Sequence, residues 1–270
     1  MTTIHPTSVV SPGARLGEGV EIGPYSIVGP NVALGAGTRL MSHVVIDGHT
    51  TLGEKCTVFP FASIGTQTQD LKYAGGITRV EIGDRTTIRE YVTVNSGTTE
   101  KEPTRVGSDG HIMAYCHIAH GCVLGNGVIM ANGAQLSGHI VVEDHAVIGG
   151  MVGVHQFVRV GRLSMVGGYT RLIKDCAPFM LVEGVPAAVR GVNQIGMQRR
   201  KMDPEAQERI RGAHRILFRQ GLSTRQALDK IREEIPPCPD VNHLLEFIEA
   251  SQRGITKARS EERLEEKDGE

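Results

Sequence analysis

An aliphatic residue recurs at every sixth position over most of the chain, and this period constrains the fold more than any other feature. Stepping by six from Ile4 to Leu172 gives 29 positions, of which 26 carry Ile, Leu, Val or Met. A period of six matches neither the 3.6-residue turn of a helix nor the two-residue alternation of one long strand. It indicates short strands joined by tight turns, and the glycine that often follows the aliphatic residue suits such turns.

The three exceptions to the period are Asp70, Gly76 and Glu100. They fall in two polar stretches, about 66–79 and about 97–104, which we expect to leave the repeat as loops. A polar loop that leaves a rigid scaffold is a usual place for binding residues, although a solvated turn would have the same composition.

The chain changes character after the repeats. Residues 1–187 are predicted to form one β-helix, and residues 188–255 show the apolar spacing of helices and are predicted to form a small C-terminal helical domain. Ser223 and Asp240 are expected to cap two of its helices. Residues 256–270 are charged and poor in apolar side chains, so we predict a disordered tail.

Composition and charge narrow the range of functions. Lys and Arg total 29 against 30 Asp and Glu, so no global basic field is available to bind nucleic acid or an anionic membrane. The five cysteines include no C-x-x-C pair, which favours free thiols in a reducing compartment over a structural zinc site. No export signal and no apolar run of transmembrane length is visible. We therefore predict a cytoplasmic protein without nucleic-acid partners or stable membrane association.

The repeat resembles that of the hexapeptide-repeat family, in which Leu, Ile or Val is followed by Gly and four further residues. Leu16-Gly17, Ile22-Gly23 and Leu34-Gly35 are examples. The resemblance implies a left-handed parallel β-helix with three hexapeptides in each triangular coil. The period alone does not set the hand. Successive coils would stack about 4.8 Å apart, with the periodic aliphatic side chains filling the interior.

Stacking of positions three hexapeptides apart gathers several histidines. His120, Gly138 and Gln156 then lie along one edge on three adjacent coils, flanked by His139 and His155. None of them occupies an inward aliphatic position. A single outward histidine is most simply a surface or subunit-contact residue. Three beside a glycine with an accessible N–H could instead combine a general base with an oxyanion donor, which acyl transfer to a hydroxyl requires.

Several segments carry a narrower resemblance, to the acyl-carrier-protein:UDP-N-acetylglucosamine O-acyltransferase family. They are FASIGTQTQDLKYAGGITRVEIGDRTTIRE (61–90), HIAHGC (117–122), SGHIVVEDHAVIGGMVGVHQF (137–157), GVN (191–193) and QRR (198–200). The resemblance covers residues 1 to about 255. It implies transfer of a 3-hydroxyacyl group from acyl-carrier protein to the glucosamine 3-hydroxyl of UDP-N-acetylglucosamine, the first step of lipid A biosynthesis. It further implies a homotrimer with sites between subunits, no metal and no cofactor beyond the phosphopantetheine-linked acyl group of the co-substrate.

The resemblance also implies residue roles. His120 would be the general base and the Gly138 N–H the oxyanion donor. Gly168 matches the position that closes the acyl groove, and glycine there implies a long 3-hydroxyacyl chain. Family members often carry an acidic residue after the catalytic histidine, whereas this chain has Gly121, so a backbone carbonyl is a candidate to orient the ring. The positions implied to bind or line the sugar-nucleotide site are Asp70, Lys72, His117, His139, His155, Gln156, Asn193 and Arg199.

Three other interpretations stay open at this point. A sister acyltransferase could act on a 3-amino sugar nucleotide, whereas the N-acylating relative usually has a large N-terminal domain, and here the hexapeptides begin at Ile4. A zinc-dependent hydratase of the same fold would use three spaced histidines as ligands. A purely structural solenoid would explain the repeats but not the clustered histidines.

Overall fold

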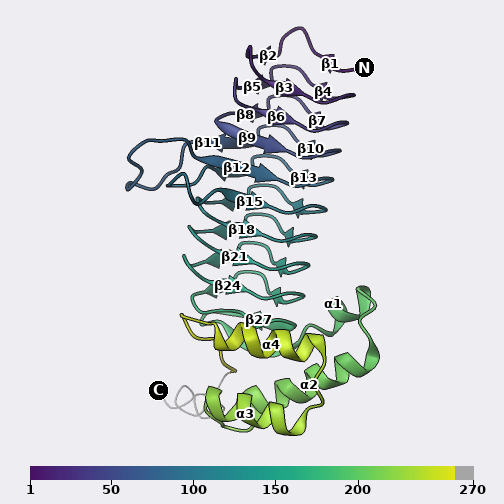
Figure 1. Cartoon of the computed structure of the whole chain (residues 1–270), viewed down its shortest axis with the longest axis vertical. Coiled ribbons are helices and arrows are strands. Elements are labelled where there is room, and N and C mark those ends of the chain that lie inside the picture. Colours follow the sequence, from purple (N-terminus) through teal and green to yellow (C-terminus); the bar gives the residue numbers. More distant parts are fainter. Residues whose placement is uncertain (259–270) are drawn as a thin grey trace, which may run out of the picture.

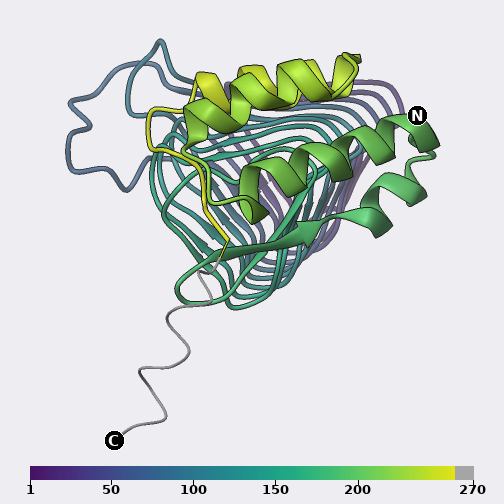
Figure 2. The same ribbon diagram turned by 90° about the horizontal axis from the view of Figure 1, so that it is seen from below.

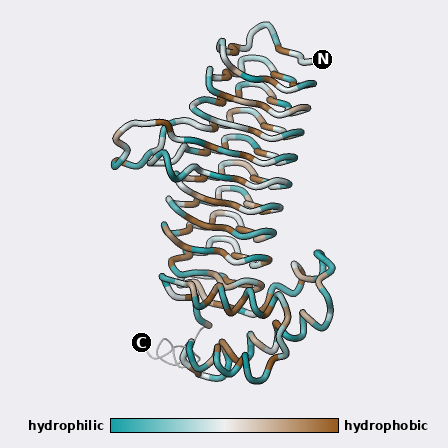
Figure 3. The backbone as a smooth tube through the Cα atoms, in the orientation of Figure 1, coloured by the Kyte–Doolittle hydropathy of each residue, from teal (hydrophilic) through white to brown (hydrophobic). Residues whose placement is uncertain are grey.

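The chain forms a tall triangular column with helices at one end (Figure 1). The structure is a computed structural model and describes residues 1–258. The column is a left-handed parallel β-helix, and the predicted fold class is confirmed. Hydrophobic residues recur in register up the column (Figure 3). Each coil contributes one strand to each wall, and the periodic aliphatic side chain of that strand points inward. The side chains that recur every six residues therefore stack into a continuous interior.

Three sheets form the walls of the column. The eleven-stranded sheet contains, in order, β1 (Thr3–Ile4), β4 (Glu21–Ile22), β7 (Arg39–Leu40), β10 (Thr57–Val58), β13 (Thr87–Ile88), β16 (His111–Ile112), β19 (Ile129–Met130), β22 (Val147–Ile148), β25 (Met165–Val166), β27 (Met180–Glu183) and β28 (Ala188–Val192). The nine-stranded sheet contains β2 (Val9–Val10), β5 (Ile27–Val28), β8 (Val45–Ile46), β11 (Ser63–Thr66), β14 (Thr93–Asn95), β17 (His117–Ile118), β20 (Gln135–Leu136), β23 (Gly153–Val154) and β26 (Arg171–Leu172). The eight-stranded sheet contains β3 (Arg15–Leu16), β6 (Ala33–Leu34), β9 (His49–Leu52), β12 (Arg79–Ile82), β15 (Thr104–Val106), β18 (Val123–Leu124), β21 (Val141–Val142) and β24 (Arg159–Val160).

The predicted stacking of every third hexapeptide is confirmed where the repeat is uninterrupted. His117 pairs with Gln135, and Gln135 pairs with Gly153, in parallel register. The step along the chain is longer only where a loop is inserted: Ser63 pairs with Thr93 across the first loop, and Thr93 pairs with His117 across the second. The two loops therefore leave the column with the pairing kept on either side, apart from a register shift between Ile64 and Thr66 at the start of the first loop.

The two loops project side by side from the same edge of the column (Figures 1 and 2). The first connects β11 to β12 and the second connects β14 to β15. The Thr98 hydroxyl donates to a carboxylate oxygen of Asp70 at 3.1 Å, and the Ile77 N–H donates to Glu100 at 3.0 Å. The second loop thus supports the first, which carries the QDLKY segment.

Three edges separate the walls. We call the edge between the nine- and eight-stranded sheets, which contains His120 and Gly138, the histidine edge. The α1 edge lies between the eight- and eleven-stranded sheets and contains Gly127 and His145. The third, the aromatic edge, lies between the eleven- and nine-stranded sheets. Its stacked rings have centroids 4.9–5.1 Å apart and belong to Tyr25, His43, Phe61, Tyr91 and Tyr115.

Four helices close the C-terminal end of the column (Figure 2). They are α1 (Gln194–Arg199), α2 (Pro204–Arg219), α3 (Thr224–Glu234) and α4 (Pro239–Glu249). Ser223 caps α3 through a capping box, as predicted. The prediction for Asp240 is wrong: Cys238 is the N-cap of α4, because Pro239 takes the first helical position, where its missing N–H costs nothing. No helix described in the structure is long and apolar enough to cross a membrane.

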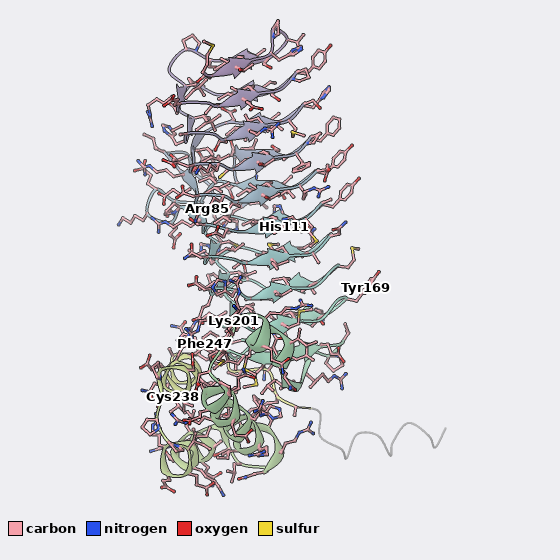
Figure 4. All side chains as sticks on the ribbon, turned by 90° about the vertical axis from the view of Figure 1, so that its right-hand side faces the viewer. Arg85, His111, Tyr169, Lys201, Cys238 and Phe247 are labelled. Atoms are coloured by element: carbon pink, nitrogen blue, oxygen red, sulfur yellow. The ribbon has the colours of Figure 1, made fainter. Side chains whose placement is uncertain are left out.

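Polar and aromatic contacts attach α4 to the column. His243 on α4 lies 2.7 Å from a carboxylate oxygen of Glu143, and Arg162 pairs with Asp240. The Arg159 guanidinium lies 4.1 Å from the ring centroid of Phe247, which is labelled in Figure 4. The charged side chains in these contacts are partly buried, so the contacts orient the helices on the end of the β-helix.

The segment after α4 returns to the column. Ile255 forms a bridge with Asp175, and Ala258 with Val189. The Thr256 N–H donates to the Asp175 carbonyl at 2.8 Å, and Thr256 is only 4% exposed. The predicted disorder is therefore wrong for residues 256–258, because backbone groups at the C-terminal end of the β-helix form hydrogen bonds with them. The rest of that prediction concerns residues 259–270, which lie outside the described part of the chain.

Replacing Ile118 by Ala should lower the free energy of unfolding by about 2–5 kcal/mol, because a closed prism of side chains cannot collapse around the cavity. Ile118 is completely buried, whereas Val123 in the next strand is 37% exposed. Val123→Ala is the matched control and should cost about 0.5 kcal/mol or less. Chemical denaturation of both variants measures the difference, and equal losses would contradict this account of the interior.

Candidate active site

The histidine edge brings His120 and Gly138 together on adjacent coils. His120 follows β17 and Gly138 follows β20. The His139 N–H donates to the His120 carbonyl at 3.0 Å, and the Phe157 N–H donates to the Gly138 carbonyl at 3.2 Å. Backbone pairing between coils therefore sets the spacing of these residues, as the hexapeptide period predicts.

Gly138 gives the His120 ring the space that it occupies. A Cβ atom at Gly138 would lie 2.2 Å from Cε1 and 2.5 Å from Nε2 of His120. Any larger residue would displace the imidazole. Among the described residues the Gly138 N–H has no hydrogen-bond acceptor, so it is free to donate to a ligand beside the ring.

Asp70 reaches the same ring from the first loop. Its Oδ2 lies 3.8 Å from Nε2 of His120, and the two side chains are 19% and 15% exposed. The Lys72 N–H donates to Asp70 Oδ1 at 3.0 Å, and Thr98 donates to Oδ2 at 3.1 Å. The Lys72 N–H is the main cause that lowers the pKa of Asp70, with help from Thr98 and His120. Asp70 is thus held as a carboxylate beside the imidazole.

The pKa of His120 is lowered from its ordinary value, so the ring is neutral near pH 7 and can accept a proton. Burial is the largest cause, and the neighbouring His139 adds to it. The carboxylates of Asp70 and Glu102 act in the opposite direction. Nδ1 of His120 is buried and has no hydrogen-bond partner in the described part of the chain, so the expectation that a backbone carbonyl orients the ring is wrong.

Packing orients the His120 ring instead, and the same packing explains why residue 121 is a glycine. The His139 ring meets the His120 ring edge-on at 4.8 Å and stacks on Phe157 at 4.9 Å. A Cβ atom at Gly121 would lie 2.6 Å from Nδ1 of His139, and Gly121 has a φ of +64°. The His139 ring therefore occupies the space of a side chain at Gly121. The Gly121 N–H donates to the Thr104 hydroxyl at 3.0 Å.

The other predicted residues of the histidine edge surround this pair. His117 accepts or donates a 2.7 Å hydrogen bond with Thr93, and burial lowers its pKa. Lys72 is exposed on the first loop. His155 and Gln156 are exposed two coils from His120 toward the C-terminal end of the column. These side chains give the edge several donors and one ammonium group for a polar, anionic ligand.

Three predicted site residues lie on other edges of the chain. Asn193 caps α1 by accepting from the Gly196 N–H at 3.0 Å and donates to the Leu163 carbonyl at 2.8 Å. Arg199, also on α1, is exposed, and both residues line a groove on the α1 edge with His145 and Arg200. Gly168 is exposed on the aromatic edge. One copy of the chain therefore does not bring these three residues to His120.

Two residues beside the site were missed by sequence reasoning. Thr98 hydrogen-bonds Asp70, and the Glu102 carboxylate raises the pKa of His120. Both belong to the second loop, which interrupts the six-residue period, but the period does not tell which way the loop folds.

No group of three His, Cys, Asp or Glu side chains is placed to hold a metal ion within residues 1–258. The rings of His120 and His139 on the histidine edge meet edge to face rather than converging on one point. The geometry suits proton transfer at Nε2, beside a free N–H that could donate a hydrogen bond to an oxyanion.

Known proteins are similar to this chain over 95% of its length. The model of the bacterial transferase hexapeptide family matches residues 103–138, and the model for domain 2 of UDP-N-acetylglucosamine O-acyltransferase matches residues 175–256. The acyl-carrier-protein–UDP-N-acetylglucosamine O-acyltransferase of Myxococcus xanthus is 51% identical, over 95% of this chain and 100% of its own. Among solved structures, the UDP-N-acetylglucosamine acyltransferase of Francisella novicida superposes with a TM-score of 0.92 at 34% identity, over 96% of this chain and 95% of its own. The corresponding enzyme of Campylobacter jejuni gives 0.89 at 39% identity, over 95% and 100%.

Replacing Asp70 by Asn should lower the pKa of His120 further. Burial and His139 lower that pKa, whereas the Asp70 carboxylate raises it, so its removal leaves the imidazole with less stabilisation of its charged form. An NMR titration of the histidine Cε1–H signals measures the change. Glu21→Gln is the control, because that carboxylate pairs with Arg39. An unchanged or higher His120 pKa in the Asp70 variant would show that the carboxylate does not act on the ring.

Proposed function

Because the chain belongs to the UDP-N-acetylglucosamine O-acyltransferase family, we propose that it transfers a 3-hydroxyacyl group from acyl-carrier protein to the glucosamine 3-hydroxyl of UDP-N-acetylglucosamine. This is the first step of lipid A biosynthesis. The similarity to the Myxococcus xanthus enzyme extends over 95% of the chain. The observation that carries the chemistry is a half-buried His120 whose ring packs directly on Gly138 and whose pKa is lowered by burial.

In the proposed reaction, His120 is the general base. Its Nε2 takes the proton of the sugar 3-hydroxyl as that oxygen bonds to the thioester carbonyl carbon. The carbonyl oxygen becomes an oxyanion and accepts a hydrogen bond from the Gly138 N–H. The carbon–sulfur bond then breaks, and the imidazolium returns its proton to the departing thiolate. The two substrates and this one proton balance the reaction, so we propose that it needs no metal or cofactor.

In this proposal Asp70 helps to position the substrate and also supports the base. Its carboxylate, 3.8 Å from Nε2, stabilises the imidazolium that forms when the sugar hydroxyl loses its proton. Lys72, on the same loop, offers an ammonium group to the diphosphate. The polar side chains that we assign to the sugar and the diphosphate along the same edge are His117, His139, His155 and Gln156.

A neighbouring copy of the chain completes the site in our proposal. Asn193 and Arg199 are assigned to the nucleotide end of the substrate, yet they lie on the α1 edge of their own chain. If the α1 edge of one subunit faces the histidine edge of the next, three copies around an axis complete three identical sites. We therefore propose a homotrimer.

The aromatic edge supports that assembly. Tyr25, Tyr91, Tyr115 and Tyr169 are 45–76% exposed, and Figure 4 shows Tyr169 pointing outward. Exposed aromatic rings along one line are typical of a surface that another protein covers. The aromatic edge is the third edge of the triangular column and is distinct from the histidine edge and the α1 edge. When those two edges meet the neighbouring subunits, the aromatic edge can face the trimer axis.

We propose a long 3-hydroxyacyl chain for the donor. Gly168 is exposed, and a Cβ atom there would meet only the backbone of Gly150, at 3.3 Å or more. The position therefore leaves room beside the aromatic edge of the chain where a larger residue would project. Donors of graded chain length would show the preference.

The cysteines indicate the cellular setting, and the similar proteins bear on the alternative functions. All five cysteines are free thiols, which favours a reducing compartment, and we propose the cytoplasm. The comparisons do not favour the zinc-dependent hydratase or the enzyme for a 3-amino sugar nucleotide.

Replacing His120 by Ala should reduce the rate of acyl transfer by roughly 10²–10⁴-fold, because no other group takes the proton of the sugar hydroxyl. The assay follows 3-hydroxyacyl transfer from acyl-carrier protein to UDP-N-acetylglucosamine. His5→Ala, which alters an exposed histidine in the first coil, is the control and should retain the rate.

Gly138→Ala tests the geometry rather than the base. It should also lower the rate, because its methyl group would displace the His120 ring. A His120→Ala variant with the full wild-type rate would exclude this mechanism, and an inactive wild type would exclude the reaction itself.

Replacing Tyr91 and Tyr115 together by Lys should dissociate the trimer, because like charges would then line the aromatic edge. Light scattering during size-exclusion chromatography should show the wild type at three times the chain mass and the variant at a smaller multiple. Val123→Lys, at an exposed apolar residue of the eight-stranded sheet and away from the aromatic edge, is the control. Circular dichroism checks that the β-helix is retained, and a folded trimeric double variant would contradict the assigned contact.

A further inference from the structure

The groove on the α1 edge has a volume of about 760 Å³ and lies between α1 and the column. Figure 1 shows α1 beside the last coils. Arg199, Arg200 and His145 supply the charged or titratable groups of its lining, which contains no aspartate or glutamate. Apolar side chains, among them Ile129 and Val147, line the rest. The groove therefore offers an anion three basic groups and no competing carboxylate.

The two arginines of the groove are not neutralised by their surroundings. Within residues 1–258 no carboxylate lies within 4.0 Å of Arg199 or Arg200. Asp109 is paired elsewhere, since it accepts a hydrogen bond from Arg85 at 2.7 Å. That hydrogen bond is the main cause that lowers the pKa of Asp109, and Arg200 contributes less. Both guanidinium groups of the groove are therefore available to a ligand.

Gly127 lets the His145 ring and the Arg200 side chain lie close together. A Cβ atom at this buried glycine would lie 2.3 Å from Nδ1 of His145 and 3.1 Å from a guanidinium nitrogen of Arg200. Both side chains therefore occupy the space over one residue. The His145 N–H donates to the Asn126 carbonyl at 2.8 Å, so pairing between coils fixes the backbone that carries the ring. An anion bound by Arg200 would lie within reach of the imidazole.

His145 can gain a charge when an anion binds. Burial is the main cause that lowers the pKa of its ring, and the Arg200 guanidinium adds to it, whereas the Asp144 carboxylate acts in the opposite direction. The charged groups that face the ring or share its groove are those of Asp109, Asp144, Arg162, Arg199 and Arg200. The ring is therefore neutral near pH 7 in the free chain. A bound anion would offset Arg200 and raise the pKa of the ring.

We propose that His145 acts with Arg200 as a proton-dependent contact for the diphosphate of the sugar nucleotide. The inference rests on the proposed function, which assigns the nucleotide end of the substrate to this groove. The diphosphate adjoins the nucleoside and carries the negative charge of the substrate, so it is the part that can contact both groups. The imidazole takes up one proton from the solvent as the diphosphate binds and releases that proton when the nucleotide leaves.

Proton uptake makes the affinity for the nucleotide depend on pH. Below the pKa of His145 in the free chain the ring is already charged, and the affinity is at its highest. As the pH rises from this pKa to the higher pKa of the complex, binding must bring a proton with it and the affinity falls. Above the pKa of the complex the ring is neutral in both states, and the affinity changes no further.

Calorimetric titration of the full-length chain with UDP-N-acetylglucosamine, between about pH 5 and about pH 8, measures this dependence. The wild type should bind about tenfold less tightly at the upper end, which corresponds to a pKa rise of about one unit in the complex. His145→Gln keeps a polar side chain but cannot gain a charge, so it should lose about tenfold at the lower end and match the wild type at the upper end. His5→Gln, at an exposed histidine of the first coil, is the control and should behave as the wild type.

An NMR titration of the His145 Cε1–H signal tests the wild type without a variant. The pKa of His145 should rise when UDP is added and stay unchanged with uridine, which lacks the phosphates. An equal rise with uridine would overturn the diphosphate contact. A wild type that binds the sugar nucleotide with the same pH dependence as His145→Gln would overturn the role of His145 and leave the proposed function intact. A wild type that binds neither UDP-N-acetylglucosamine nor UDP would overturn the proposed function itself.

Discussion

The hydrogen bonding between successive coils is the constraint on which the rest of the structure depends. Each strand is two to five residues long, too short to be stable by itself, and gains its partners only from the coils above and below. Register must therefore be kept at every coil, and a slip of one residue would turn the aliphatic side chains outward. The same register stacks the turns, so positions three hexapeptides apart share an edge. The apolar interior and the candidate site therefore both follow from the register between successive coils.

That rule explains which parts of the molecule could be predicted. The period predicts the walls, the two loops and the stacking of His120 on Gly138, because each depends only on counting along the chain. It could not predict the contact between Thr98 and Asp70, since loops that leave the column are no longer bound by its register. The start of α4 at Pro239 and the pairing of residues 256–258 depend on local competition for backbone partners, which periodicity does not record.

Side-chain volume at two turns decides how the histidines meet. Gly138 lets the His120 ring lie on the backbone, and Gly121 leaves space for the His139 ring that holds His120 from the side. An acidic side chain at Gly121 would collide with His139. The carboxylate beside the imidazole comes instead from Asp70, on a loop that a second loop supports.

The rigid column also separates the groups that one substrate would need. Walls held by repeated backbone pairing cannot bend to bring the α1 edge to the histidine edge of the same chain. In the proposed reaction, a sugar nucleotide held at both ends would therefore lie between two chains, and the rigidity that prevents closure within one chain would keep the distance between its two ends constant.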